Sequence, residues 1–294
     1  MLYDGDNSLL LATGLELDGI ADVLKSGNIE AALKQKGEKY LDRYIAFKKY
    51  NTLRREGKLK NPILPIIAAL PCVGKTTMSR EVATAFGIGI VMGGDAFRAA
   101  LREFVSQEKH PEFFSSVYQA WKFFGEENEE NILKGFEFQA KLVNQAMERI
   151  VVDRGIRDGE SIVAEYLHFL PSQYPPEVLK HPSIIPIVLR LDSEEEWKRR
   201  IAARDNATHL KGQSGRLLEV LDRYKLMQEY QCKQAKEHGV HIVVNDDWNK
   251  GRDKVLDIIF DRIKQLNKMA EEGIVADDKK IIEKIEEERK KFNQ

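Results

Sequence analysis

A short loop between an apolar run and a helix-like segment limits the possible folds of this chain more than any other stretch. The apolar run covers residues 62–68 (PILPIIA), the loop 69–77 (ALPCVGKTT), and a helix-compatible segment 78–86. Strand, tight loop and helix, with Gly-Lys-Thr at the turn, match the phosphate-binding pattern GxxxxGK[ST]. In such a loop, backbone N–H groups surround phosphate oxygens, the lysine reaches the β- and γ-phosphates, and the hydroxyl binds Mg²⁺. The pattern therefore predicts a nucleoside triphosphate site.

Two positions depart from the consensus of this loop. Ala69 replaces the first glycine, and alanine still permits close backbone approach where φ is negative. Pro71 stiffens the middle of the loop. Gly-Lys-Thr alone occurs by chance in many chains, so the prediction depends on the strand before it and the helix after it. The predicted nucleotide contacts are Cys72, Val73, Gly74, Lys75, Thr76, Thr77 and the more distant Arg204.

Composition and charge exclude several classes of function. Lys and Arg total 46 against 47 Asp and Glu, which argues against a large nucleic-acid or anionic-membrane surface, since such surfaces need clustered basic residues. No apolar run approaches the roughly 18 residues of a membrane span, and Asp4 and Asp6 interrupt the start, so no signal peptide is expected. With only Cys72 and Cys232, no disulfide framework is expected. We expect a cytoplasmic protein.

Apolar segments alternate with helix-like segments along the middle of the chain. Apolar runs recur at 87–94, 161–165, 183–191 and 240–245, with helical patterns at 96–105 and 112–155, the latter broken at 125–131. This alternation predicts an α/β fold with a mostly parallel sheet and helices on both faces. Ligands of such sheets bind beyond the carboxyl ends of the strands, where Gly74, Asp95 and Glu165 should converge.

Charged residues near these strand ends are candidates for phosphoryl transfer, which needs positioning and positive charge more than covalent chemistry. Asp95 could orient or deprotonate an attacking hydroxyl, and it is equally suited to cap the following helix. Glu165 is expected to act as a Walker B-type acid at Mg²⁺, together with Thr76. Arg98 and Arg102 suit an anionic substrate, with a solvated helix face as the alternative. The catalytic candidates are Lys75, Asp95, Arg98 and Glu165, and the substrate-binding candidates are Arg98, Arg102 and His168.

Several short motifs in a fixed order resemble those of the archaeal 2-phosphoglycerate kinase family. They are GDAFRAALR (94–102), FSSVYQAWK (114–122), GFEFQA (135–140), AEYLHFLP (164–171), YKLMQEY (224–230) and HIVVN (241–245). The resemblance covers roughly residues 40–250. It implies a P-loop kinase that uses ATP and Mg²⁺ to phosphorylate a hydroxyl of a small, already phosphorylated hydroxy acid.

The chain departs from this family at the substrate side. The family has a loop of the type GASGVG, a threonine before the strand-end aspartate, and EGVH where this chain has EYLH; by an ungapped reading, a late arginine appears here as Lys225. We expect Tyr166, with Phe97 and Phe169, to make the acceptor pocket more apolar. That expectation favours a substrate with a hydrocarbon portion, as in the divergent archaeal mevalonate-3-phosphate 5-kinases, over 2-phosphoglycerate.

We expect three parts: a helical N-terminal extension (1–60), the P-loop kinase domain (61–250) and charged C-terminal helices (251–294). Within the second part, residues of about 199–223 are expected to form a lid that closes arginines onto phosphate, with an exposed basic helix pair as the alternative. The residues that suggest it are Arg199, Arg200, Arg204, Lys211, Gly212, Gly215, Arg216 and Arg223. The last helix is expected to be solvated, with a homo-oligomer contact as the alternative.

Two other functions remain open from the sequence alone. A kinase of nucleosides, sugars or nucleic-acid ends would share the same core, although the balanced charge disfavours a nucleic-acid partner. A nucleotide-binding regulator without turnover would be compatible with Ala69 and with the charged C-terminal helix. Retention of Lys75, Thr76, Asp95 and Glu165 favours an enzyme with a small-molecule partner, and no membrane partner is expected.

Overall fold

The computed structural model describes residues 6–207, 213–276 and 278–292. Its centre is a five-stranded sheet in the order β2-β3-β1-β4-β5, and every neighbouring pair is parallel. The strands are β1 (Leu64–Ala68), β2 (Ile90–Gly93), β3 (Ile162–Tyr166), β4 (Ile184–Arg190) and β5 (His241–Val244). Each strand falls within one of the predicted apolar runs or overlaps it, so the predicted parallel α/β fold is confirmed.

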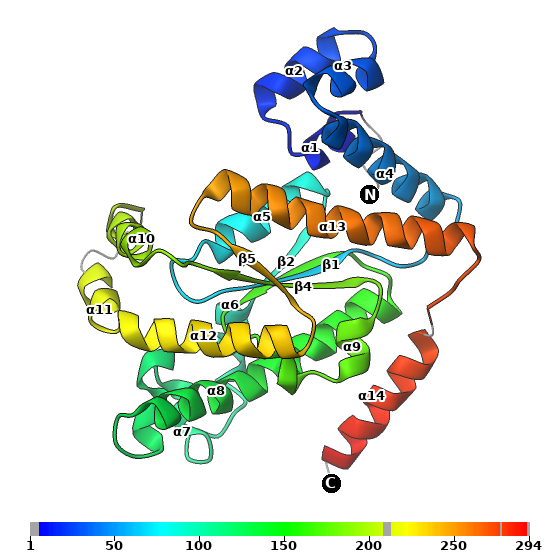
Figure 1. Ribbon diagram of the computed structural model, residues 1–294. Helices are drawn as coiled ribbons and strands as arrows, with labels where there is room; N and C mark the ends of the chain where they lie inside the picture. Colours follow the sequence, from blue (N-terminus) through cyan, green and yellow to red (C-terminus); the bar gives the residue numbers. More distant parts are fainter. Residues whose placement is uncertain (1–5, 208–212, 277, 293–294) are drawn as a thin grey trace.

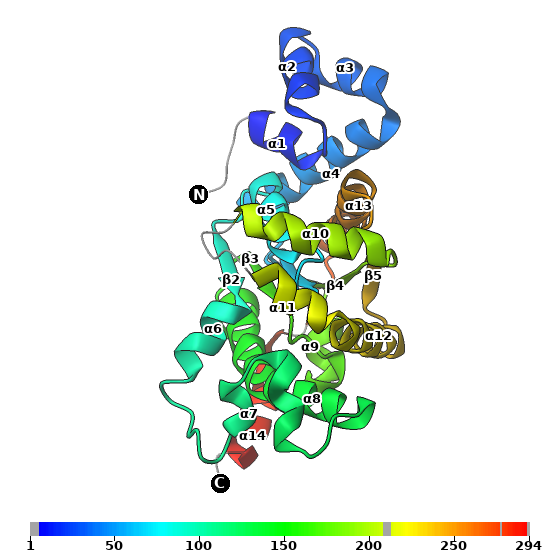
Figure 2. The ribbon, with the colours of Figure 1, turned by 90° about the vertical axis from the view of Figure 1, so that its left-hand side faces the viewer.

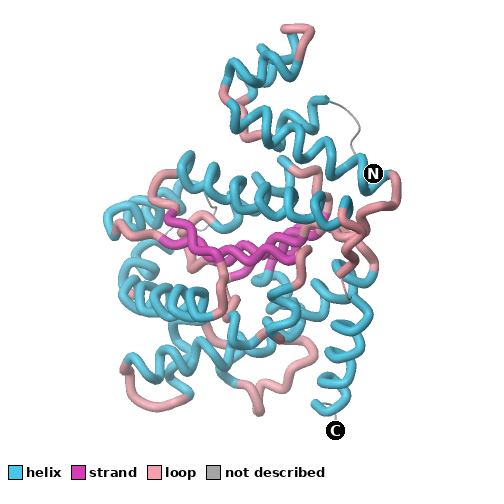
Figure 3. Tube along the Cα trace, turned by 45° about the vertical axis from the view of Figure 1, so that its right-hand side comes forward, coloured by secondary structure: helices cyan, strands magenta, loops and turns pink. Residues whose placement is uncertain are grey.

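Helices cover both faces of the sheet (Figures 1 and 3). α5 (Lys75–Ala85) and α13 (Trp248–Glu271) lie on one face, and α8 (Glu129–Ile150), α9 (Pro176–Lys180) and α12 (Leu221–Glu237) lie on the other. The remaining segments of this region are α6 (Gly94–Leu101), α7 (Pro111–Phe114), α10 (Glu194–Ala207), α11 (Gln213–Glu219), the 3₁₀ helices Val117–Phe123 and Pro171–Gln173, and a π-helical turn at Val151–Arg157.

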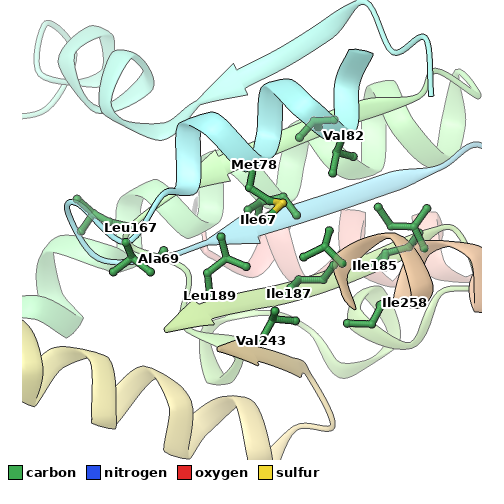
Figure 4. Close-up of a cluster of buried hydrophobic side chains, with 14 of the residues drawn as sticks. Ile67, Ala69, Met78, Val82, Leu167, Ile185, Ile187, Leu189, Val243 and Ile258 are labelled. Atoms are coloured by element: carbon green, nitrogen blue, oxygen red, sulfur yellow. The ribbon is translucent and has the colours of Figure 1, made fainter. Parts of the chain in front are cut away.

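The alternation of side chains along the central strands produces two separate cores. Because successive residues of a strand point to opposite faces, Ile66 of β1 packs with the α8 and α9 side while Ile67 packs with the α5 and α13 side. Figure 4 shows the second core, where Met78 and Val82 of α5 lie over Ile67. Both strand faces are therefore buried, which explains why these strands are nearly continuous apolar runs.

The N-terminal region forms the helices α1 (Asp6–Ala12), α2 (Leu17–Lys25), α3 (Ile29–Lys36) and α4 (Glu38–Arg55), in agreement with its predicted helical periodicity. It packs beside α13, as Figure 1 shows. The buried Arg43 of α4 joins the two regions, since it donates hydrogen bonds to the Thr13 carbonyl and to the carboxylates of Asp253 and Asp257. The division of the chain into three domains remains a prediction.

The C-terminal helix α14 (Asp278–Phe292) does not stand free in solvent, contrary to the sequence-based expectation. Its Ile285 is 3% exposed and joins the core on the α8 side of the sheet. Asp278 accepts a 2.9 Å hydrogen bond from Nε2 of the buried His181, whose Nδ1 accepts from the Ser183 N–H. The thin apolar stripe of this helix is therefore an intramolecular packing surface. In the described part of the chain, no helix is both long and apolar enough to span a bilayer.

Gly94 holds α6 against the end of β3. A Cβ atom at this position would lie 2.1 Å from Cβ of Tyr166, a backbone-proximal atom that cannot move aside. We therefore expect Gly94→Ala to lower the free energy of unfolding by about 3 kcal/mol, the cost of overpacking a closed site. Gly89→Ala is the matched control, because a Cβ there meets no atom within 4 Å. Urea unfolding checks the pair, and equal stabilities of the two variants would contradict the close approach.

Candidate active site

The loop between β1 and α5 lies at the point where the strand order reverses. β1 lies between β3 and β4. The chain connections on the two sides of β1 therefore run in opposite directions across the sheet. Parallel sheets bind ligands in the crevice outside the strand ends at such a point. A pocket of about 630 Å³ opens there between the loop, Asp95, arginines of α10 and α11, and the aromatic side chains of Tyr118, Tyr224 and Trp248. Figure 2 views the molecule from this side, with α10 and α11 in front of the sheet.

The loop backbone forms a concave row of peptide groups. Cys72 has φ 66° and Gly74 has φ 108°, both in the left-handed region, and residues with negative φ stand on either side of each. Alternation of this kind turns successive N–H groups toward one point and creates an anion-binding nest. Cys72 is the one non-glycine with positive φ among the described residues, and it occupies the position of a glycine in the resembling family. The helix start at Lys75 adds further free N–H donors.

Lys75, Thr76 and Glu165 meet at the mouth of this nest. Thr76 Oγ1 lies 3.3 Å from Glu165 Oε1, and Lys75 Nζ lies 3.6 Å from the same oxygen. Both ends of this ion pair are nearly enclosed, with side-chain exposures of 12% and 13%. The second carboxylate oxygen, Oε2, is buried and has no hydrogen-bond partner among the described residues. The predicted grouping of these three residues is therefore present.

The group of residues around Glu165 fits a hydrated magnesium ion. Mg²⁺ in nucleotide sites takes few protein oxygens and completes its shell with phosphate and water. A threonine hydroxyl and a carboxylate with one unpaired oxygen supply such a partial set. Among the described residues there is no cluster of three or more His, Cys, Asp and Glu side chains that would form an all-protein metal cage. The site thus suits an ion that arrives with a phosphate ligand.

Asp95 lines the same pocket as the loop and is exposed. α6 begins two residues earlier than a capping role for Asp95 would require, with Gly93 at the N-cap and no side-chain capping bond. The alternative role of Asp95 as helix cap is therefore wrong. Its carboxylate is in the first turn of α6 and is available to a group bound in the pocket.

Arg98 and Arg102 are not among the residues that line the pocket, and they share two hydrogen-bond partners. Both guanidinium groups donate to the carbonyl oxygens of Phe113 and Ser115. Neither forms an ion pair with a carboxylate in the described ranges. Burial, followed by the charge of the neighbouring Arg102, lowers the pKa of Arg98 to about 10. The structure therefore holds two partly buried cations side by side, and the charge of the Asp95 carboxylate raises the pKa of Arg98 without forming an ion pair.

His168 is completely buried, and the predicted substrate contact is not seen. Its Nε2 pairs at 2.9 Å with Oε1 of Gln139, and its carbonyl accepts a hydrogen bond from Asn144. Burial lowers the pKa of His168 well below its usual range, and the charges of Arg98 and Lys75 act in the same direction. His168 is thus a neutral core residue behind the site, the structural role that a lone histidine more often has.

His168 should make the protein less stable in acid. The pKa of His168 in the folded state lies below its unfolded value of 6.5. As the pH falls through 6.5, the unfolded chain therefore binds a proton at His168 while the folded protein does not. We expect this residue alone to remove about 1.4 kcal/mol of unfolding free energy per pH unit below that point. Urea unfolding at pH 7.5 and pH 5 compares wild type with His168→Gln. The variant should lose about 2 kcal/mol less than the wild type, whereas identical losses would contradict a neutral buried histidine.

Tyr166 does not fill the acceptor pocket as the sequence suggested. It is fully buried, its hydroxyl pairs with that of Tyr174, and its ring packs edge-on against Phe169. Phe169 is also fully buried, while Phe97 packs at the margin of the same core. The apolar residues that do line the pocket include Leu70, Leu167 and Leu217. An apolar acceptor pocket remains a prediction, and Tyr166 and Phe169 are not among the residues that line this pocket.

Basic residues of α10 and α11 border the pocket, as predicted for the segment 199–223. Arg199, Arg200, Arg204 and Arg216 line it. Arg223 instead pairs with Glu127 outside the pocket. Lys211 and Gly212 lie outside the described residues, and closure of a lid remains a prediction.

Several pocket residues were not identified from the sequence. Tyr118 and Tyr224 lie in two of the motifs quoted above, and their rings meet edge to face at a centroid distance of 6.0 Å. Arg216 lies over the Tyr118 ring, and Trp248 starts α13 beside the loop. A motif position was the only available signal for the two tyrosines, and no local pattern marks Trp248.

Comparison with known proteins places the chain among small-molecule kinases. No protein-family model matches it. A mevalonate-3-phosphate 5-kinase of Thermoplasma acidophilum is 32% identical over 197 residues, which are 67% of this chain and 95% of that protein. A 2-phosphoglycerate kinase of Methanocaldococcus jannaschii is 28% identical over 265 residues, 88% of this chain and 84% of that protein.

The comparison with solved structures is weaker than the comparison of sequences. A gluconokinase of Sinorhizobium meliloti covers 70% of this chain and 94% of its own, at 12% identity and a TM-score of 0.36, which is too low to support an argument. The sequence relatives, the parallel sheet and the phosphate-binding loop agree with one another. The chain belongs to the family of P-loop kinases that includes the archaeal 2-phosphoglycerate kinases and mevalonate-3-phosphate 5-kinase.

Proposed function

We propose that this protein uses ATP and Mg²⁺ to phosphorylate a hydroxyl group of a small, already phosphorylated hydroxy acid. The observation that carries the proposal is the meeting of Lys75, Thr76 and Glu165 at the phosphate-binding loop, with Asp95 lining the same pocket as Lys75 and Thr76. Phosphoryl transfer requires positive charge at the phosphates, residues that hold the metal ion, and an acid that contacts the acceptor hydroxyl.

In the proposed reaction, the nest of loop N–H groups and the start of α5 hold the β-phosphate, and Lys75 neutralises charge on the γ-phosphate. Thr76 and Glu165 would hold Mg²⁺, which would supply positive charge that offsets the charge of the phosphate groups. Asp95 orients the acceptor hydroxyl and accepts its proton. The acceptor oxygen then bonds to the γ-phosphorus, the bond to the bridging oxygen breaks, and ADP leaves.

The acceptor's own phosphate or carboxylate is proposed to bind Arg98 and Arg102. Burial lowers the pKa of Arg98 most, and repulsion from the neighbouring Arg102 guanidinium lowers it further. An anion would relieve this repulsion and accept bidentate hydrogen bonds. Binding requires the two side chains to exchange the carbonyls of Phe113 and Ser115 for the substrate.

Mevalonate 3-phosphate is our preferred acceptor, and 2-phosphoglycerate is the alternative. Leu167 and Leu217 with the rings of Tyr118 and Tyr224 give the pocket an apolar wall. A methyl-branched carbon chain would bury surface against this wall, worth roughly 0.8 kcal/mol per methylene-sized group, and glycerate phosphate lacks such a chain. The longer alignment with a 2-phosphoglycerate kinase keeps the alternative open.

The test is ADP release from Mg·ATP with the two acceptors offered in parallel to the same purified protein. We expect turnover with mevalonate 3-phosphate and a kcat/KM at least about tenfold lower with 2-phosphoglycerate, the discrimination that one or two buried methyl groups provide. The reverse preference would establish the alternative. Tight ATP binding without turnover of either compound would refute both acceptors.

A further inference from the structure

Two carbonyl groups of the phosphate-binding loop are held by side chains from outside the loop. Nε1 of Trp197 in α10 donates to the Pro71 carbonyl at 3.0 Å. The Val73 carbonyl accepts two hydrogen bonds, from Nη1 of Arg200 at 2.7 Å and from Nδ2 of Asn245 at 2.8 Å. The donors come from α10 and from the end of β5, both more than a hundred residues along the chain from the loop.

These bonds fix the direction of the loop N–H groups. In a trans peptide the C=O and N–H point in opposite directions. The Pro71 carbonyl shares its peptide plane with the N–H of Cys72, and the Val73 carbonyl shares its plane with the N–H of Gly74. Cys72 and Gly74 line the pocket, whereas Trp197 and Asn245 do not. The two carbonyls are held in the direction opposite to the N–H groups of Cys72 and Gly74. These two N–H donors therefore turn toward the pocket, where phosphate is proposed to bind.

The anchors are themselves held tightly. Trp197 is 1% exposed and Asn245 is 0% exposed. The Asn245 amide is enclosed between two glycines, since a Cβ on Gly74 would lie 2.7 Å from its Nδ2 and a Cβ on Gly251 would lie 2.3 Å from its Oδ1. Neither glycine position tolerates a side chain while the amide stays in place. The amide thus has a single available position, aimed at the loop.

Arg200 connects the two anchoring elements. Its Nε donates to Glu196 Oε1 at 2.6 Å, and its Nη2 donates to the carbonyl of Asn245 at 2.5 Å. One guanidinium therefore joins α10, the loop and the end of β5. Side chains that are fixed by such surrounding contacts hold a binding site in its productive geometry.

We propose that Trp197, Arg200 and Asn245 are positioning residues that hold the loop in its phosphate-binding conformation, an inference that rests on the proposed binding of ATP at this loop. The need for them follows from the loop's own sequence. Ala69 replaces the first glycine, and Cys72 adopts a left-handed conformation that is unfavourable for a non-glycine residue. External hydrogen bonds offset this cost and keep the N–H groups turned toward the ligand.

Trp197→Phe and Asn245→Ala test the proposal, because each removes a donor to a loop carbonyl and neither residue lines the pocket. Lys198→Met is the matched control: it removes a charge from the same helix, where Lys198 is exposed and pairs with Glu194 away from the loop. Calorimetric titration with Mg·ADP gives the Kd, and thermal unfolding gives the Tm. Each test variant should bind Mg·ADP about tenfold more weakly at a temperature well below its Tm, and the control should match the wild type.

The outcomes separate this inference from the proposed function. If the wild type does not bind Mg·ADP, the proposed function fails and the inference fails with it. If the wild type binds and both test variants bind within about twofold of it, the proposed function stands and the positioning role is refuted. A lowered Tm with unchanged Kd would likewise refute it, because the contacts would then serve only the stability of the fold. In steady-state assays, the KM for ATP should rise while the KM for the acceptor stays unchanged.

Discussion

Substituting methionine for Lys75 is expected to reduce kcat/KM for phosphoryl transfer by about 10³-fold or more, the effect of removing a preorganised charge from an enclosed site. Methionine preserves much of the side-chain volume but removes the ammonium group that lies 3.6 Å from Glu165. The variant thus loses the charge that neutralises the γ-phosphate. The measurement is the initial rate of ADP release at several ATP concentrations, together with thermal unfolding to confirm the fold.

Lys254→Met is the control for this substitution, because Lys254 is exposed on α13 and lies away from the pocket. It should retain the wild-type rate within about twofold, as surface substitutions usually do. A folded Lys75→Met enzyme that kept a tenth or more of the wild-type kcat/KM would contradict the role assigned to the loop.

Asp95→Asn should lower kcat by about 10²–10³-fold while leaving the affinity for ATP nearly unchanged, as expected for loss of a group that accepts the acceptor proton. The asparagine keeps the shape of the side chain, and no helix cap is lost because Asp95 does not cap α6. A drop in kcat without a change in Kd for ATP would place the effect on the acceptor side. Rates and ATP titrations measured on the same preparation provide both values.

Glu103→Gln is the control for the acid, since Glu103 follows α6 closely, is exposed and does not line the pocket. Its kcat should equal that of the wild type. Equal kcat values for Asp95→Asn and the wild type would remove Asp95 from the mechanism and leave the acceptor hydroxyl without an identified partner.

The three central strands could be predicted from the sequence because β1, β3 and β4 are buried on both faces. Such strands are short apolar runs between turn residues, and β1 and β4 show this directly. The direction of Tyr166 could also have been predicted. Ile162 and Ala164 of β3 point into the α8-side core, and the period of two places Tyr166 on that side as well. The presence of Tyr166 where the resembling family has a glycine suggested the pocket instead.

Other parts of the site depend on contacts that no local pattern encodes. The sequence predicted Arg98 and Arg102 on one helix over 96–105, but α6 ends at Leu101 and Arg102 is its C-cap. Their shared partners are carbonyls of residues that follow an irregular segment. The anchoring of the loop by Trp197 joins residues that are 126 positions apart. α6 starts at Gly94, which packs closely against Tyr166. Because of this tertiary contact, Asp95 lies within the first turn of the helix and is not its N-cap. Long-range packing therefore decided each of these features.

The central claim is that this pocket transfers the γ-phosphate of ATP to a small phosphorylated hydroxy acid. The most direct measurement incubates the protein with Mg²⁺, ATP carrying a radiolabelled γ-phosphate, and mevalonate 3-phosphate, and then separates the products. The account predicts that the label appears in a bisphosphorylated acceptor with the wild type and does not appear with Lys75→Met. Label released only as inorganic phosphate, or label transferred equally by both proteins, would contradict it.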